Sequence, residues 1–210
     1  MSDAKAIYTI GHSTRSLEEF LALLNAHGVS HLADIRTVPR SRRHPHFAGE
    51  ALSRSLEEAG ILYTHFPGLG GLRKPRADSP NVAWRHEGFR GYADYMETAE
   101  FAAAVDELVA FGAGEHRAAS RGRAPRPEPG AGPLRVAGGV EAPRVVIMCA
   151  EAVFWRCHRQ LVADALVAHG IEVRHVVGAA ENPHRLTAFA RVDGDRVVYD
   201  RAGQPRLPGT

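Results

Sequence analysis

Both cysteines of the chain lie in one short stretch that also holds acidic and basic side chains. Cys149 ends an apolar run and is followed by Glu151, while Cys157 precedes His158 and Arg159. A thiol near the first turn of a helix or near cationic groups has a lowered pKa and is a better nucleophile. The spacing predicts Cys149 as a catalytic residue with Glu151 as a general acid or base. We expect the positive charge of His158 and Arg159, beside Cys157, to bind an anion.

The same cysteines allow three other interpretations. Free cysteine often packs as a small apolar side chain. This packing role remains an open alternative for Cys149 and is the favoured interpretation for Cys157. A disulfide between them is geometrically conceivable across the intervening loop, but two cysteines indicate a reduced compartment. Both cysteines with His158, and His12 as a fourth residue, could bind a metal ion. Because adjacent residues 157 and 158 are expected to point in different directions, we predict no metal and no other cofactor.

Other polar candidates follow apolar runs elsewhere in the chain. His12 and Ser13 come directly after the first run, and we assign His12 to the catalytic residues and Ser13 to substrate binding. Asp34 ends the second run and leads to Arg36 and a basic segment that contains Arg42. Guanidinium groups bind phosphate in a bidentate manner, and Asp34 would orient Arg36 through an ion pair. A solvated basic loop is the alternative interpretation of this segment.

The elements that must position these residues alternate between strands and helices. Apolar runs predict strands over 5–10, 29–35, 61–66, 144–149 and 171–177. Helical spacing predicts helices over 16–28, 49–60, 88–112 and 157–170, the first with a capping box of Ser16 and Glu19. Residues 187–200 are expected to form a terminal hairpin with its turn at Asp193-Gly194. This order predicts an α/β three-layer sandwich, with a mostly parallel sheet, helices on both faces and a C-terminal hairpin.

The predicted sheet gathers the candidate residues at one place. Ligand sites of open parallel sheets form in the crevice at the carboxyl ends of the strands. Each candidate group, after the strands over 5–10, 29–35 and 144–149, falls at that edge. Packing alone does not require such a coincidence, so we predict a functional cleft there.

Length and composition limit the possible domain organisation, location and partners of the protein. The 210 residues, 44% of them hydrophobic, suit a single α/β domain over 1–210. The Pro-, Gly- and Arg-rich stretch 113–143 has no periodicity and is expected to be a disordered insertion. No apolar stretch is long enough to span a membrane, and the N-terminus has no secretion signal, so a cytoplasmic location is expected. A net charge of +2 in an Arg-rich composition is weak support for a nucleic-acid partner.

Taken together, these stretches resemble the family known as domain of unknown function 488. The most specific match is Met148-Cys149-Ala150-Glu151 followed by Cys157-His158-Arg159, and further matching residues are Thr9 to Ser13, Asp34 to Arg36, Pro39, Ser41, Arg42, Phe47, Leu69 to Gly71, Phe89, Tyr92, Met96 and His175. The resemblance implies a cytosolic, mostly bacterial α/β domain and does not imply a reaction. The loop 152–156 is apolar, whereas many relatives carry an acidic residue and proline there.

A looser likeness points to rhodanese-type sulfurtransferases. Their strand, cysteine loop and helix, and their Asp-x-Arg after an earlier strand, are similar to the region of Cys149 and to Asp34-Ile35-Arg36. In that interpretation Cys149 would carry a persulfide. The bulky Phe154 and Trp155 argue against it, because converging backbone amides need small residues in that loop.

These observations lead to a ranked set of functions. The first is an intracellular enzyme that acts on an anionic, phosphate-bearing substrate such as a nucleotide or nucleic acid. The second is a rhodanese-like sulfurtransferase that uses Cys149, and the third is a non-catalytic module that binds an anion or nucleic acid. The expected partner is an anionic small molecule or nucleic acid, and no membrane.

Overall fold

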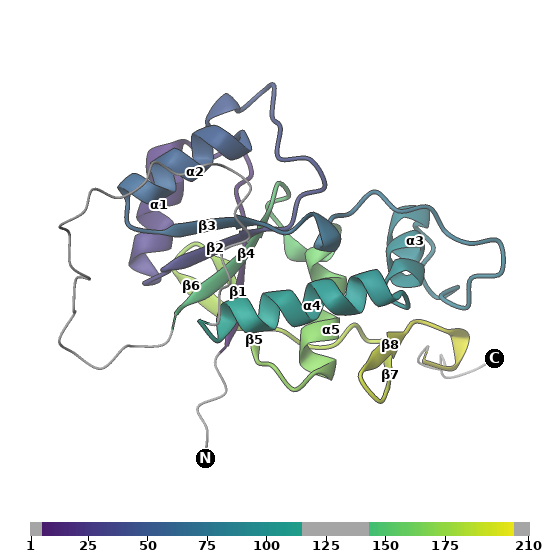
Figure 1. Ribbon diagram of the computed structural model, residues 1–210. Helices are drawn as coiled ribbons and strands as arrows, with labels where there is room; N and C mark the ends of the chain where they lie inside the picture. Colours follow the sequence, from purple (N-terminus) through teal and green to yellow (C-terminus); the bar gives the residue numbers. More distant parts are fainter. Residues whose placement is uncertain (1–5, 115–142, 204–210) are drawn as a thin grey trace, which may run out of the picture.

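The computed structural model describes residues 6–114 and 143–203 (Figure 1). The strands are β1 (Ile7–Gly11), β2 (His31–Asp34), β3 (Leu62–His65), β4 (Val145–Cys149), β5 (Val173–Val177), β6 (Ala180–Pro183), β7 (Arg191–Asp193) and β8 (Arg196–Val198). The α-helices are α1 (Leu17–Ala26), α2 (Gly49–Glu58), α3 (Glu87–Tyr95), α4 (Ala99–Gly112) and α5 (Arg159–Ala168). The predicted insertion 113–143 lies, apart from its ends, outside the described residues. None of the helices within the described ranges is long and apolar enough to cross a membrane.

The main sheet has the strand order β3-β2-β4-β1-β5-β6. The first five strands run parallel, and β6 is antiparallel to β5. From β1 the chain crosses over β4 to reach β2, while from β4 it crosses over β1 to reach β5. From β2 the chain leads outward to β3, whereas from the neighbouring β4 it leads in the opposite direction to β5. The connections therefore diverge between β2 and β4, and such a switch point is where open α/β sheets form ligand sites.

Helices cover both faces of the sheet, as the three-layer prediction requires (Figure 1). The side chains of β4 alternate between two cores, with Val146 and Met148 packing on one side and Ile147 and Cys149 on the other. The first core includes residues of α1 and α2, and the second includes residues of α3, α4 and α5. Because a strand with both faces buried must be apolar throughout, the sequence of β4 reads as a continuous apolar run. The α/β fold with its terminal hairpin, β7 and β8, is confirmed.

Local signals explain most element ends. Ser16 caps α1, and its side chain and that of Glu19 form the predicted capping box. The predicted helix over 88–112 is wrong in one respect, because the structure has two helices there. The break lies at Thr98, whose extended backbone and side-chain bond to the Phe101 N–H start α4. The Thr98 side chain is thus a helix start signal inside a stretch of otherwise helical periodicity.

The C-terminal segment is joined to α5 by a buried carboxylate. Asp164 is fully buried and accepts hydrogen bonds from His184 (2.8 Å), Tyr199 (2.8 Å) and both the backbone N–H and hydroxyl of Thr187. His184 continues this chain of bonds to His175 of β5 at 2.9 Å. A buried carboxylate is stable only when its oxygens are satisfied in this way.

We expect Asp164→Asn to destabilise the protein by about 2–3 kcal/mol, because an NH2 group, which cannot accept a hydrogen bond, replaces one of the two carboxylate oxygens that these donors need. The free energy of unfolding in urea measures the effect. Asp106→Asn is the control, since Asp106 is exposed on α4 and should change stability by less than about 0.5 kcal/mol. Equal stabilities of the two variants would contradict this role of Asp164.

Candidate functional site

A cleft of about 1240 Å³ opens at the carboxyl ends of β1, β2 and β4. It therefore lies at the switch point of the sheet, where the sequence predicted it. The predicted residues that line it are His12, Ser13, Arg36, Arg42, Cys149, Glu151, Cys157 and His158. Asp34 and Arg159 do not line the cleft, and both are buried beneath it with 0% and 1% exposure.

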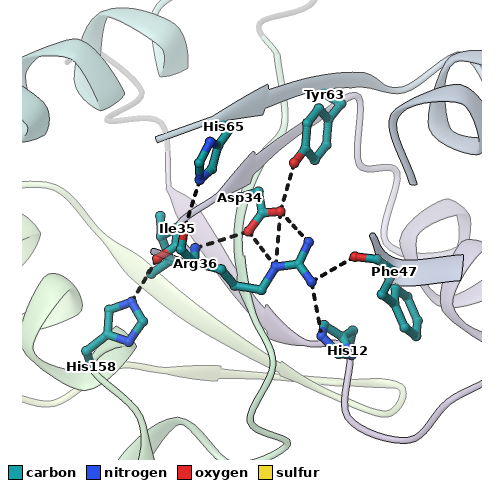
Figure 2. Close-up of polar contacts among 8 residues, drawn as sticks. All are labelled: His12, Asp34, Ile35, Arg36, Phe47, Tyr63, His65 and His158. Atoms are coloured by element: carbon teal, nitrogen blue, oxygen red, sulfur yellow. Dashed lines mark hydrogen bonds and ion pairs between the residues drawn. The ribbon is translucent and has the colours of Figure 1, made fainter. Parts of the chain in front are cut away.

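Asp34 and Arg36 form a buried ion pair next to the cleft (Figure 2). The Asp34 carboxylate accepts from the guanidinium and the backbone N–H of Arg36 and from the Tyr63 hydroxyl at 2.8 Å. Burial, followed by the neighbouring Asp34 charge, raises the pKa of Tyr63. Arg36 also donates to the Phe47 carbonyl at 2.8 Å. The hydrogen-bonding groups of the Arg36 guanidinium are thus largely used within the protein. Arg36 therefore serves to hold the backbone in place more than to bind a ligand.

Two histidines contact the backbone on either side of this pair (Figure 2). Nε2 of His65 is 2.8 Å from the carbonyl oxygen of Arg36, and Nε2 of His158 is 3.0 Å from that of Ile35. Because a carbonyl only accepts, Nε2 carries the proton in both rings. The unprotonated Nδ1 of His158 is therefore free for another interaction. Burial lowers the pKa of His158 to about 4, so this ring is neutral near pH 7 and does not supply the expected positive charge.

His12 forms part of the cleft wall as a neutral ring. It stacks on Phe47 with ring centres 4.2 Å apart, and its Nδ1 donates to the Ser13 carbonyl at 2.9 Å. Burial lowers its pKa to about 4, while the Ser13 carbonyl opposes that shift. Nε2 faces the Arg36 guanidinium at 3.5 Å and can accept from it. Ser13 itself has a left-handed backbone, with φ of 54°, which is uncommon outside glycine and recurs at functional sites.

Cys149, Cys157 and His158 meet in the cleft. The structure pairs Cys149 with Cys157 as a disulfide, which the sequence did not favour, and the two sulfurs and Nδ1 of His158 lie within 4.8 Å of one another. The expectation that residues 157 and 158 point in different directions is wrong. Residue 157 is extended and residue 158 is helical, and this change of backbone conformation before α5 brings both side chains to one side. Gly71 makes room for the His158 ring, since a Cβ there would lie 3.0 Å from Nδ1.

Arg159 has a structural position instead of the predicted anion-binding one. Its guanidinium donates to the carbonyl oxygens of Glu151, at 2.6 Å, and of Ala152. Burial lowers its pKa to about 10, which leaves it charged near pH 7. Gly11 permits this arrangement, because a Cβ at that position would be 1.8 Å from the Glu151 carbonyl oxygen. Arg159 therefore holds the loop after β4 and does not line the cleft.

The outer wall of the cleft carries exposed cationic and apolar side chains. The side chains of four exposed arginines line it and make no hydrogen bond or ion pair with another described residue: Arg40, Arg42, Arg43 and Arg156. Trp155 and Leu72 line it with 57% and 91% exposure. Arg40 and Arg43 belong to the basic segment around Arg42 that the sequence indicated. The sequence did not indicate Arg156, Trp155 or Leu72 as lining residues. Their clustering depends on how the loops converge, for which the sequence has no local signal.

We expect Asp34→Asn to lower the free energy of unfolding by about 3–5 kcal/mol, because it leaves the buried Arg36 charge without its partner. Urea unfolding measures the change, and Arg36→Met added to Asp34→Asn should recover part of the loss. The control is Glu172→Gln, which removes an exposed ion pair with Arg174 and should cost less than about 1 kcal/mol. If Asp34→Asn lowers the free energy of unfolding by no more than this control does, the Asp34–Arg36 pair does not stabilise the fold.

The neutral histidines also predict how stability depends on pH. Burial lowers the pKa of His12 and His158 to about 4 and that of His175 to about 3, from about 6.5 in the unfolded chain. Between about pH 6.5 and pH 4 the unfolded state binds more protons, so stability should fall as pH falls through this window. Urea midpoints at pH 7.5, 6 and 5 measure the trend. His86→Gln, at an exposed position, should leave it unchanged, and equal midpoints at all three pH values would contradict the buried neutral state.

Comparison with known proteins identifies a family but no specific activity. A family model described as "Domain of unknown function DUF488" matches residues 16–119. The matched segment includes Asp34 and Arg36 and ends before Cys149 and Cys157. No curated protein and no solved structure matches the chain. This match confirms the predicted resemblance to the DUF488 family over residues 16–119.

Proposed function

We propose that the protein binds a phosphate-bearing ligand, a nucleotide or a segment of nucleic acid, in the cleft at the strand ends, and acts on it there. The observation that carries the proposal is the set of four exposed arginines in the outer wall, Arg40, Arg42, Arg43 and Arg156. The buried cation Arg36 is neutralised by Asp34, whereas the guanidinium groups of these four make no hydrogen bond or ion pair with another described residue. They are therefore available to a ligand.

The balance of charge along the cleft favours an anion. Glu151 is the one acidic residue among those that line it, against five arginines. The planar guanidinium presents paired N–H groups that match two oxygens of a phosphate, and it stays charged at every physiological pH. Several arginines on adjacent loops can contact successive phosphates or the phosphates of one nucleotide.

Aromatic side chains favour a nucleobase next to the phosphate. The Trp155 ring is 57% exposed and meets Phe154 edge-on, with centres 5.0 Å apart, so that a flat face of the indole can be offered to a ligand. Phe89 and Tyr92 line the same cleft. Bases stack on such rings with little dependence on sequence, whereas an inorganic anion or a simple sugar phosphate gains nothing comparable.

Glu151 is the strongest candidate for chemistry on that ligand. It is exposed at the end of β4 and can exchange a proton with a bound substrate as general acid or base. Cys149 is only 3% exposed and its sulfur is paired with that of Cys157, which favours a role for the two cysteines as a pair over an isolated nucleophile. The sulfurtransferase alternative has less support, because among the described residues only the Glu151 N–H reaches the Cys149 sulfur, at 3.4 Å.

We expect the double variant Arg42→Ala, Arg43→Ala to bind a fluorescently labelled single-stranded oligonucleotide at least about tenfold more weakly than the wild type at low salt. Anisotropy titrations at several salt concentrations measure affinity and its salt dependence. Each lost phosphate contact makes the slope of log K against log salt shallower by about 0.7, or about 1.4 for two contacts.

Arg54→Ala with Arg196→Ala is the matched control, since both arginines are exposed, lie outside the cleft and remove the same charge. An equal loss in both double variants would mean that only net charge matters, which contradicts the proposal. Trp155→Ala should weaken binding with little change in the salt slope, because it removes stacking and no charge. Consumption of the bound nucleotide, followed by chromatography, separates an enzyme from a non-catalytic module.

A further inference from the structure

The three residues that meet in the inner cleft have the chemistry of metal ligands. Thiolate sulfur and imidazole nitrogen are the donors that zinc and other thiophilic divalent ions prefer. In a tetrahedral zinc site with ordinary bond lengths, a sulfur and a nitrogen ligand stand about 3.5 Å apart. The Cys157 sulfur and Nδ1 of His158 are 3.6 Å apart. This pair is therefore already at the separation that a shared ion requires.

In the reduced protein, the backbone geometry suits a shared ion better than a disulfide. The Cα atoms of Cys149 and Cys157 are 7.8 Å apart, whereas disulfides usually span about 4.4–6.8 Å between Cα atoms. Two cysteines that share a metal ion need no such close approach of their backbones. The distance between the two Cα atoms is thus one at which both cysteines can bind the same ion.

The orientation of His158 supplies an independent argument. Its Nε2–H donates to the Ile35 carbonyl at 3.0 Å, which leaves the lone pair of Nδ1 directed away from that carbonyl. Metal-binding histidines are typically oriented in this way, with the second ring nitrogen donating to a carbonyl or carboxylate. Within the described part of the chain, the polar contact of Nδ1 is with the Cys157 sulfur. Nδ1 is therefore a buried electron-pair donor in contact with a sulfur, which is the arrangement of two ligands that share one ion.

Backbone N–H groups favour the thiolate form of both cysteines. The Glu151 N–H is 3.4 Å from the Cys149 sulfur, and the Arg159 N–H is 3.5 Å from the Cys157 sulfur. A sulfur that carries negative charge accepts such bonds better than a neutral thiol does. His12 is not a further ligand, since Nδ1 is bonded to Ser13 and Nε2 faces the Arg36 guanidinium.

We propose that Cys149, Cys157 and His158 bind one thiophilic divalent metal ion, with zinc as the first candidate, and that its fourth position opens into the cleft. Binding releases the two thiol protons, so the two thiolates balance the charge of the ion. All three residues line the cleft, so water or a bound ligand can reach the fourth position. Three protein ligands and one open position are typical of catalytic, not structural, zinc sites. The inference goes beyond the proposed function and does not depend on nucleotide binding.

Metal titration of the whole, reduced, chelator-treated chain tests the site. We expect zinc to bind in a ratio of one ion per chain, measured by competition with a chromophoric chelator. Cobalt in place of zinc should produce the near-ultraviolet absorption of a thiolate-to-cobalt bond, which needs no variant and reports on the only two cysteines of the chain. A folded, reduced wild type that binds neither ion would overturn the proposal. So would a pair of cysteines that stays oxidised under mild reductant.

Three variants identify the ligands. We expect each of three variants to weaken zinc binding by at least about tenfold: Cys149→Ser, Cys157→Ser and His158→Ala. Tenfold is the lower end of the loss that follows when a residue that only hydrogen-bonds to a metal ligand is removed, so losing a ligand itself should cost at least as much. His86→Ala is the control, because His86 lines the same cleft but lies outside the cluster. Retention of wild-type affinity in a folded ligand variant would contradict the assignment. The Arg42→Ala, Arg43→Ala variant should keep its zinc, so that failure of the nucleotide proposal is distinguishable from failure of this one.

Discussion

The buried ion pair of Asp34 and Arg36 determines how the rest of the site is arranged. Two charges under the end of a sheet are stable only when their remaining hydrogen-bonding positions are satisfied, and the protein achieves this with Tyr63 and the Phe47 carbonyl. These contacts fix the backbone at Ile35, whose carbonyl orients the His158 ring. One interaction therefore connects the end of β2, the basic segment and the start of α5.

The cleft that results differs in charge between its inner and outer parts. The inner part contains neutral imidazoles, paired sulfurs and a guanidinium that is neutralised by Asp34. The outer part carries exposed arginines and an exposed tryptophan. Such an arrangement attracts an anionic ligand to the outer wall while the inner part remains suitable for a metal ion or for acid–base chemistry. The separation follows from solvation, because a cation can stay unpaired only where water reaches it.

The sequence predicted the framework of this arrangement and several of its residues. Apolar runs and helix caps located the strands and helices, and the rule for parallel sheets placed His12, Asp34, Arg36 and Cys149 at one edge. Such signals are local, so they can be read from short stretches of chain. The break at Thr98 escaped prediction because the apolar periodicity continues through it.

What the sequence could not predict depends on contacts between distant residues. Arg159 was expected in the anion site, yet its guanidinium is directed to the Glu151 carbonyl, which only the folded loop reveals. Tyr63 and the Ile35 carbonyl gave no signal, since neither a strand tyrosine nor a backbone carbonyl stands out in a sequence. The convergence of Cys157 and His158 required the backbone conformations of two adjacent residues.

The orientation of His158 is the most direct test of this account, because it depends on the Asp34–Arg36 pair on one side and prepares the cysteine cluster on the other. Long-range proton–nitrogen correlation spectra of the reduced protein, free of metal and near pH 7, would report the protonation of each ring nitrogen. We predict a neutral ring with the proton on Nε2 and an unprotonated Nδ1. A charged ring, or one protonated on Nδ1, would contradict the account.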